Sequence, residues 1–373
     1  MGSVGLATLL LAACSREAER RVDNPPGPVN VYAHTTSADR SPATANALSR
    51  VYVPDVKSSD LFVIDPSSRK VVDHFAIGGD PQHVIPSWDL KTLWVAGSAR
   101  GRRYPGKLTA INPNTGKVTF AVTVPDAYNM YFTPDGSSAV VVAESRRRLE
   151  YRNPKTMKYQ AALDVPGCSG INHADYSPRG HYAIFTCEFD GKLAKIDVVR
   201  RKVLGYLRLA GGGMPQDIRI SPDGSVFYVA NMMTDGVSVI DGNLFREVAF
   251  IRTGVGAHGL YPSRDGSRLY VSNRGSHLVD GPPGGPGSVS VIDFASRKVE
   301  KTWPIPGGGS PDMGNVSIDG RDLWLSGRFD GVVYDIDTTT GNVRKIAVGK
   351  SPHGLTVWPQ PGRYSLGHTG VMR

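Results

Sequence analysis

The chain has 373 residues, of which 40% are hydrophobic, 43 are glycine and 27 are proline, and its formal net charge is +9. Glycine and proline spread along a chain of ordinary hydrophobicity favour many short strands joined by tight turns. The one strongly apolar stretch, residues 4–13, is shorter than the ~18–20 residues of a transmembrane helix, which argues against a helical membrane protein.

That apolar stretch has the length of a signal-peptide core. Residues 11–14, Leu-Ala-Ala-Cys, resemble a bacterial lipobox, in which Cys14 is lipidated and becomes the mature N-terminus. No Lys or Arg precedes the stretch, so the true start is left open, and a disordered tail with a chance cysteine is the alternative. We expect a signal peptide with a lipobox over 1–14, a tether over 15–48, and an extracytoplasmic lipoprotein anchored to the membrane, at the cell surface or in the periplasm.

A strand that ends in an apolar pair followed by Asp or Asn, with three looser copies, recurs seven times at intervals of 41 to 52 residues. The copies are 63–65, 110–112, 151–153, 195–197, 239–241, 291–293 and 335–337. Between them lie turns such as residues 221–224, Ser-Pro-Asp-Gly, in which Pro presets φ, Asp bonds its own backbone and Gly accepts a positive φ. Four short strands, a to d, per about 45 residues make one propeller blade. The repeat therefore predicts an all-β, seven-bladed β-propeller of four-stranded antiparallel blades over 49–373.

The ring has to be closed by the two ends of the chain. Residues 50–53 read as a strand b, so the first blade lacks its strand a, and residues 353–357 supply one. Pairing these N- and C-terminal strands removes an exposed sheet edge. Residues 363–368 also read as a strand b, and the sequence leaves open which segment fills that slot. We expect a monomer.

The units resemble the YVTN repeat of bacterial propellers, most clearly in Val226–Asn231 and Val237–Asp241. The resemblance covers about residues 50–360 and extends to the propeller domain that holds d1-type haem in bacterial nitrite reductases. Within this group the chain looks like secreted YncE-type proteins. That resemblance implies the fold but no settled activity.

In this strand order the d-to-a and b-to-c loops share one face, which we call the mouth face, and the uniform turns lie on the other, the plain face. Irregular loops on a repeated scaffold are the usual place for function. One polar residue near the start of each strand a should point to the channel axis: His83, Asn129, His173, Asp217, His258, Asp312 and His353. Such a set could bind a metal ion or ligate haem iron, or could bond only backbone and channel water.

The b-to-c loops add arginines to the mouth face: Arg100, Arg102, Arg103, Arg146, Arg147, Arg148, Arg274 and Arg328. A ring of guanidinium groups would attract an anion such as a haem propionate, a phosphorylated ligand or an acidic surface. Solvated surface arginines are the alternative. Cys168 and Cys187 flank a predicted hairpin and could form a disulfide, which an exported protein permits, or remain two buried thiols.

Three functions follow, in this order. The first is a ligand- or cofactor-binding module at the channel mouth, for an anionic tetrapyrrole of the haem type or a metal ion. No Cys-x-x-Cys-His motif for covalent haem attachment is present. The second is a cell-surface scaffold for protein, polysaccharide or nucleic acid, although base-stacking aromatics are not clustered at the mouth. The third is a lyase or lactonase that uses channel histidines as general acid and base; no nucleophile motif such as Gly-x-Ser-x-Gly supports it, so no catalytic residue is assigned.

Overall fold

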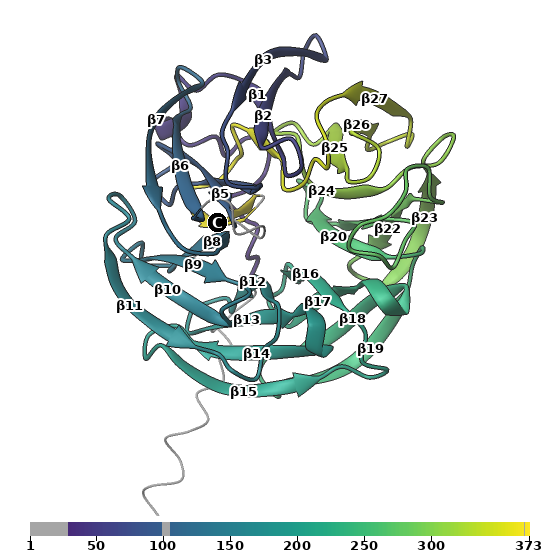
Figure 1. Ribbon diagram of the computed structural model, residues 1–373. Coiled ribbons are helices and arrows are strands. Elements are labelled where there is room, and N and C mark those ends of the chain that lie inside the picture. Colours follow the sequence, from purple (N-terminus) through teal and green to yellow (C-terminus); the bar gives the residue numbers. More distant parts are fainter. Residues whose placement is uncertain (1–28, 99–104, 369) are drawn as a thin grey trace, which may run out of the picture.

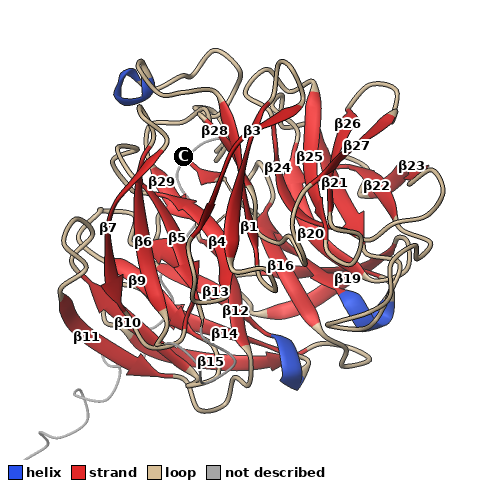
Figure 2. Ribbon diagram, turned by 45° about the horizontal axis from the view of Figure 1, so that its top comes forward, coloured by secondary structure: helices blue, strands red, loops and turns tan. Residues whose placement is uncertain are grey.

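The computed structural model describes residues 29–98, 105–368 and 370–373. Within these residues seven β-sheets are arranged around a central axis (Figure 1), and we call the region along this axis the channel. Figure 2 shows that strands dominate and that helix is confined to short turns. The prediction of an all-β, seven-bladed propeller is confirmed. No helix in the described part of the chain has both the length and the apolar character needed to cross a membrane.

Each blade begins with its innermost strand, and its other strands follow outward. Blade 1 contains β28 (Thr356–Trp358), β1 (Arg50–Asp55), β2 (Asp60–Asp65) and β3 (Lys70–Ala76). Blade 2 contains β4 (Pro81–Pro86), β5 (Leu93–Gly97), β6 (Lys107–Asn112) and β7 (Lys117–Thr123). Blade 3 contains β8 (Ala127–Phe132), β9 (Ala139–Ala143), β10 (Arg148–Arg152) and β11 (Tyr159–Asp164). Blade 4 contains β12 (Ile171–Tyr176), β13 (Tyr182–Cys187), β14 (Lys192–Asp197) and β15 (Lys202–Arg208).

The remaining blades follow the same order. Blade 5 contains β16 (Pro215–Ile220), β17 (Val226–Asn231), β18 (Gly236–Asp241) and β19 (Arg246–Arg252). Blade 6 contains β20 (Ala257–Pro262), β21 (Arg268–Asn273), β22 (Ser288–Asp293) and β23 (Lys298–Pro304). Blade 7 contains β24 (Pro311–Val316), β25 (Asp322–Gly327), β26 (Val332–Asp337) and β27 (Val343–Ala347). The 3₁₀ turns are η1 (Pro42–Thr44), η2 (Glu188–Asp190) and η3 (Met232–Thr234).

The two ends of the chain close the ring in blade 1. Strand β1 pairs antiparallel with β28, as predicted, and Val51 lies opposite Val357. The segment whose place was open forms β29 (Ser365–Gly367), which pairs with β30 (Val371–Met372). Strand β29 also pairs with β8, so this C-terminal hairpin extends blade 3 inward. The N-terminal segment therefore fills slot b of blade 1, and the C-terminal hairpin occupies the channel.

The apolar cores lie between neighbouring blades. Strands near the axis are covered on both faces and are buried along their whole length, as β16 and β17 are. Outer strands such as β15 alternate between exposed and partly buried residues. Val51 and Val53 of blade 1, for example, share a core with Trp324 of blade 7. Burial on both faces explains why the inner strands read as nearly continuous apolar runs.

The N-terminal segment, residues 29–48, packs against turns of the plain face. Val31 and Leu48 donate backbone hydrogen bonds to Pro222 and Pro113, which lie in plain-face turns. The hydroxyl of Tyr32 donates to the carbonyl of Ile220 at 2.7 Å, and the Tyr32 side chain is buried. The described part of the expected tether, residues 29–48, is therefore packed against the propeller.

Candidate functional site

Strand irregularity at the mouth-side ends of the inner strands turns polar side chains into the channel. The pairing register shifts near the first residues of β4, β8, β12, β16, β20 and β24. A bulge of this kind places an extra residue opposite one partner and re-aims its side chain. The structure brings all seven predicted channel residues to this region, each at most 3% exposed: His83, Asn129, His173, Asp217, His258, Asp312 and His353.

Three of the seven, His258, Asp312 and His353, lie together around the carboxylate of Asp312, and we call them the Asp312 group. Oδ1 of Asp312 lies 2.9 Å from Nδ1 of His258, and Oδ2 lies 2.8 Å from Nδ1 of His353. The buried guanidinium of Arg274 donates to the same carboxylate at 2.7 Å and also contacts Nε2 of His258. Arg274 further donates to the carbonyl of Leu278 at 3.1 Å, which ties the long mouth loop to the channel.

A second group lies around His83 and includes a residue that the sequence analysis did not select. The imidazole of His368, from the end of β29, lies 4.3 Å from that of His173 and 4.7 Å from that of His83, between ring centroids. Asn129 donates from Nδ2 to Nδ1 of His173 at 3.2 Å. We call His83, Asn129, His173 and His368 the His83 group. It adjoins the Asp312 group, because the rings of His83 and His353 are 4.7 Å apart.

One glycine makes room for this arrangement. A Cβ atom at position 354 would lie 1.9 Å from Nδ1 of His83, so only glycine at that position leaves space for the ring. The sequence does contain a signal for His368: residues 363–368 read as a strand for which the seven blades have no free position. A strand with no slot in a blade has to add to a sheet edge, and the channel offers one.

Burial sets the charge of these groups. It lowers the pKa of each of the five channel histidines, His83, His173, His258, His353 and His368, and that of His353 falls to about 3. Burial opposes ionisation of Asp312, but Arg274, His258 and His353 outweigh it and hold the pKa of that carboxyl well below its usual range. At neutral pH the site therefore combines neutral imidazoles, each with one lone pair, and a carboxylate.

Asp217, on β16, forms an ion pair with Arg219 that is separate from these two groups. Its Oδ1 lies 2.7 Å from Arg219 and 3.8 Å from Nε2 of His368. Its Oδ2 accepts the backbone N–H of Leu260 at 3.0 Å. Burial raises the pKa of Asp217 to about 6, although Arg219 and the backbone donors lower it, so it is mostly ionised at neutral pH.

Several imidazole nitrogens in the His83 group lack hydrogen bonds. Among the described residues neither nitrogen of His83 or His368 has a partner, and Nε2 of His173 has none. Leaving a buried polar atom unsatisfied costs about 1–3 kcal/mol. These three histidines are therefore the candidates to hold a metal ion.

The predicted arginine rim is largely paired. Arg100, Arg102 and Arg103 lie outside the described residues. Arg146 contacts Glu150 at 3.2 Å, Arg148 contacts Asp164 at 2.6 Å, and Arg147 donates to the carbonyl of Pro166. Arg274 and Arg328 are buried at the mouth, and Arg274 is held by Asp312.

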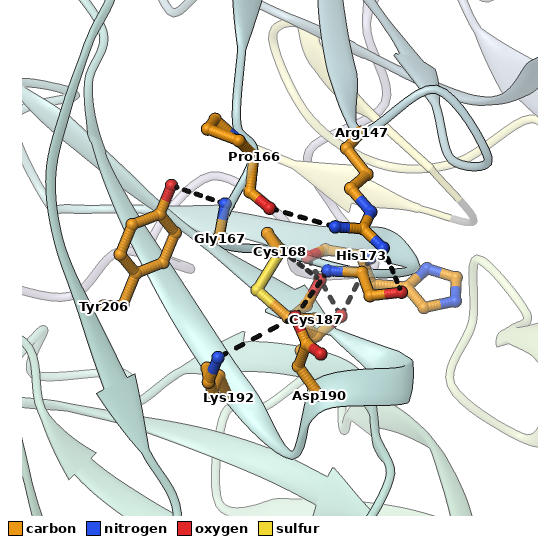
Figure 3. Close-up of a disulfide and its surroundings, with 11 residues drawn as sticks. Arg147, Pro166, Gly167, Cys168, His173, Cys187, Asp190, Lys192 and Tyr206 are labelled. Atoms are coloured by element: carbon orange, nitrogen blue, oxygen red, sulfur yellow. Dashed lines mark hydrogen bonds and ion pairs between the residues drawn. A yellow bond between two sulfur atoms is a disulfide. The ribbon is translucent and has the colours of Figure 1, made fainter.

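A disulfide joins Cys168 to Cys187, with 4.8 Å between their Cα atoms. Figure 3 shows it beside the strand that carries His173. It connects the loop before β12 to the end of β13, where Cys187 lies opposite Ile171. The bridge therefore holds the d-to-a loop that leads into a channel strand. The predicted lipidation residue, Cys14, lies outside the described residues.

Seven four-stranded blades around a polar, histidine-rich centre define a β-propeller. The family model of the YncE-like β-propellers matches residues 28–361, so the chain belongs to that family.

One relative in sequence is distant. Antigen Lp49 of Leptospira interrogans serogroup Icterohaemorrhagiae serovar copenhageni (strain Fiocruz L1-130) is 22% identical over 355 residues, which cover 86% of this chain and 72% of that protein.

Among solved structures, the periplasmic gluconolactonase PpgL of Pseudomonas aeruginosa superposes with a TM-score of 0.66 at 19% identity, covering 82% of this chain and 98% of that one. The dihydro-haem d1 dehydrogenase NirN superposes with a TM-score of 0.62 at 15% identity, covering 85% and 76%. Likeness at these identities shows the fold alone.

Proposed function

We propose that this YncE-like propeller is an extracytoplasmic binding module that holds one ion or small ligand in its channel, at the His83 and Asp312 groups. The observation that carries the proposal is the polar lining itself. Five histidines and two carboxylates are buried where a scaffold needs only packing. Burying polar atoms without partners destabilises a fold, and contacts with a bound ligand would offset that cost.

The spacing of the rings favours a ligand of ionic size. Four pairs of histidine rings that involve His83 or His368 have centroids 4.3 to 5.4 Å apart, so no macrocycle fits between them. A tetrapyrrole would have to lie above the rings, at the mouth. The described arginines there are mostly engaged by carboxylates or carbonyls, which weakens the case for a large anionic cofactor.

Two features support export and anchoring. Residues 4–14 carry the apolar core and the lipobox-like cysteine of a lipoprotein signal. The disulfide between Cys168 and Cys187 fits an oxidising compartment. Incorporation of a labelled fatty acid in cells, lost in Cys14→Ser, is the expected result, and equal labelling of the two proteins would refute the anchor.

The binding proposal is tested on protein isolated from its native compartment without chelators. Elemental analysis, an absorption spectrum and mass spectrometry of the denatured extract should find one ligand per chain. The double variant His83→Gln/His353→Gln should lose it, whereas His34→Gln, on an exposed residue of the plain-face segment, should keep it. A native protein that carries no stoichiometric element or small molecule would overturn the proposal.

A further inference from the structure

Resting on the proposed function of the channel, we propose that its ligand is a single divalent transition-metal ion, bound by His83, His368 and Nε2 of His173. The C-terminal hairpin supplies one of the three ligands, so the site forms only when that hairpin lies along β8.

The distances suit one ion. One ring nitrogen from each of the three histidines lies within 4.8 Å of those of the other two, and all three residues are fully buried. Tetrahedral zinc, with Zn–N bonds of about 2.0–2.1 Å, places its nitrogen ligands roughly 3.3 Å apart. The rings therefore have to close by on the order of 1 Å, which rotation about their side-chain bonds provides.

The hydrogen bonding of these rings is incomplete in the way that a metal would repair. Among the described residues both nitrogens of His83 and of His368 lack hydrogen-bond partners, as does Nε2 of His173. A metal ion takes one nitrogen from each ring. By contrast, the histidines of the Asp312 group contact a carboxylate through Nδ1. Apart from Nδ1 of His258, which makes no hydrogen bond although it lies 2.9 Å from Oδ1 of Asp312, the buried unpartnered imidazole nitrogens of the described residues thus gather in the His83 group.

The donor set selects the class of metal. Three imidazoles suit zinc, copper, nickel or iron, whereas magnesium and calcium require oxygen ligands. Three protein ligands leave a fourth position open for water or another small molecule. The carboxylate of Asp217, 3.8 Å from Nε2 of His368, offsets part of the charge of the cation.

Asn129 makes a sharper test possible. Its amide donates to Nδ1 of His173 at 3.2 Å, which places the proton of that ring on Nε2. Ligation through Nε2 therefore requires this proton to move to Nδ1, where Asn129 presents a donor rather than an acceptor, so the parent chain holds His173 in the tautomer that disfavours the metal. Asn129→Asp supplies that acceptor while the other carboxylate oxygen still accepts the N–H of Met130, which lies 2.8 Å from Oδ1 of Asn129. A carboxylate behind a ligating histidine strengthens metal binding by about 10- to 100-fold.

The experiment uses the full chain, freed of metal and of any affinity tag, titrated with zinc and with cobalt(II). We expect one equivalent of each ion and the visible d–d bands of tetrahedral cobalt. The variants His83→Gln, His173→Gln and His368→Gln should each weaken zinc binding by more than the roughly 10- to 100-fold that loss of a supporting partner costs. His34→Gln should bind as the parent does, and magnesium should not compete.

Each outcome bears on one proposal. If the histidine variants do not fold, the cobalt spectrum of the parent and the gain in Asn129→Asp still decide. No cobalt bands, or unchanged affinity in Asn129→Asp, overturns the metal assignment. If native protein carries another ligand that is lost in His83→Gln/His353→Gln, the proposal of a binding module is supported and only the metal assignment is refuted. Native protein with an empty channel overturns the binding module by itself, and an empty channel together with no metal binding refutes both proposals.

Discussion

Breaking the bridge between Cys168 and Cys187 should lower the free energy of unfolding by about 3 kcal/mol. The two residues are 19 apart in sequence, and closing a loop of that length in the unfolded chain costs about 11 cal/mol/K of entropy, or about 3 kcal/mol at 25 °C. Both cysteines are fully buried, so the bridge is formed inside a core that the rest of blade 4 already defines.

Urea denaturation of oxidised and reduced protein, both in a Cys14→Ser background, measures this difference without changing any side chain in the core. Cys168→Ala/Cys187→Ala should be at least as unstable as the reduced protein and should not respond to reductant. Unfolding free energies of oxidised and reduced protein within about 1 kcal/mol of each other would refute the loop-entropy reasoning.

Three further substitutions test the structure elsewhere. The carboxylate of Asp55 is fully buried with no hydrogen-bond partner among the described residues, and burial raises its pKa to about 8. Because its pKa is higher folded than unfolded, stability falls as pH rises from about 4 to about 8. Asp55→Asn should therefore stabilise the protein at pH 7 by up to about 4 kcal/mol and hardly at all at pH 4, and equal effects at both pH values would contradict the pKa. A Cβ at Gly314 would lie 1.7 Å from the carbonyl oxygen of Trp324, so Gly314→Ala should cost at least about 3 kcal/mol in urea denaturation, and a neutral result would exclude that contact. Asp312→Asn leaves the buried Arg274 without its carboxylate and should cost about 3–5 kcal/mol, unlike the exposed pair control Asp280→Asn, which should change stability by less than about 1 kcal/mol.

The blades could be predicted because their signals are local and repeated. A Ser-Pro-Asp-Gly turn, such as residues 221–224, depends on four adjacent residues, and the same turn recurs around the ring. Because the blades repeat around one axis, the geometry of one blade is expected in every other blade. If one inner strand starts beside the axis, every inner strand does, which is why a single polar residue per strand identified the channel lining.

The remaining features depend on contacts between distant segments. His368 has no counterpart in the repeat, so only the pairing of β29 with β8 brings it to His83 and His173. The arginine loops read as a charged rim because the sequence shows the cations but not their partners. Asp164 reaches Arg148 from the neighbouring strand β11, and Asp312 reaches Arg274 from the next blade.

The segment of residues 29–48 has a consequence for how the molecule would sit at a bilayer. It leaves the propeller from the plain face, where Val31 and Tyr32 contact blade 5. A lipid on Cys14 would therefore draw the plain face toward the membrane and turn the mouth outward. The mouth, beneath which the histidines are buried, would then face away from the bilayer, while the uniform turns, which vary least from blade to blade, would face the headgroups.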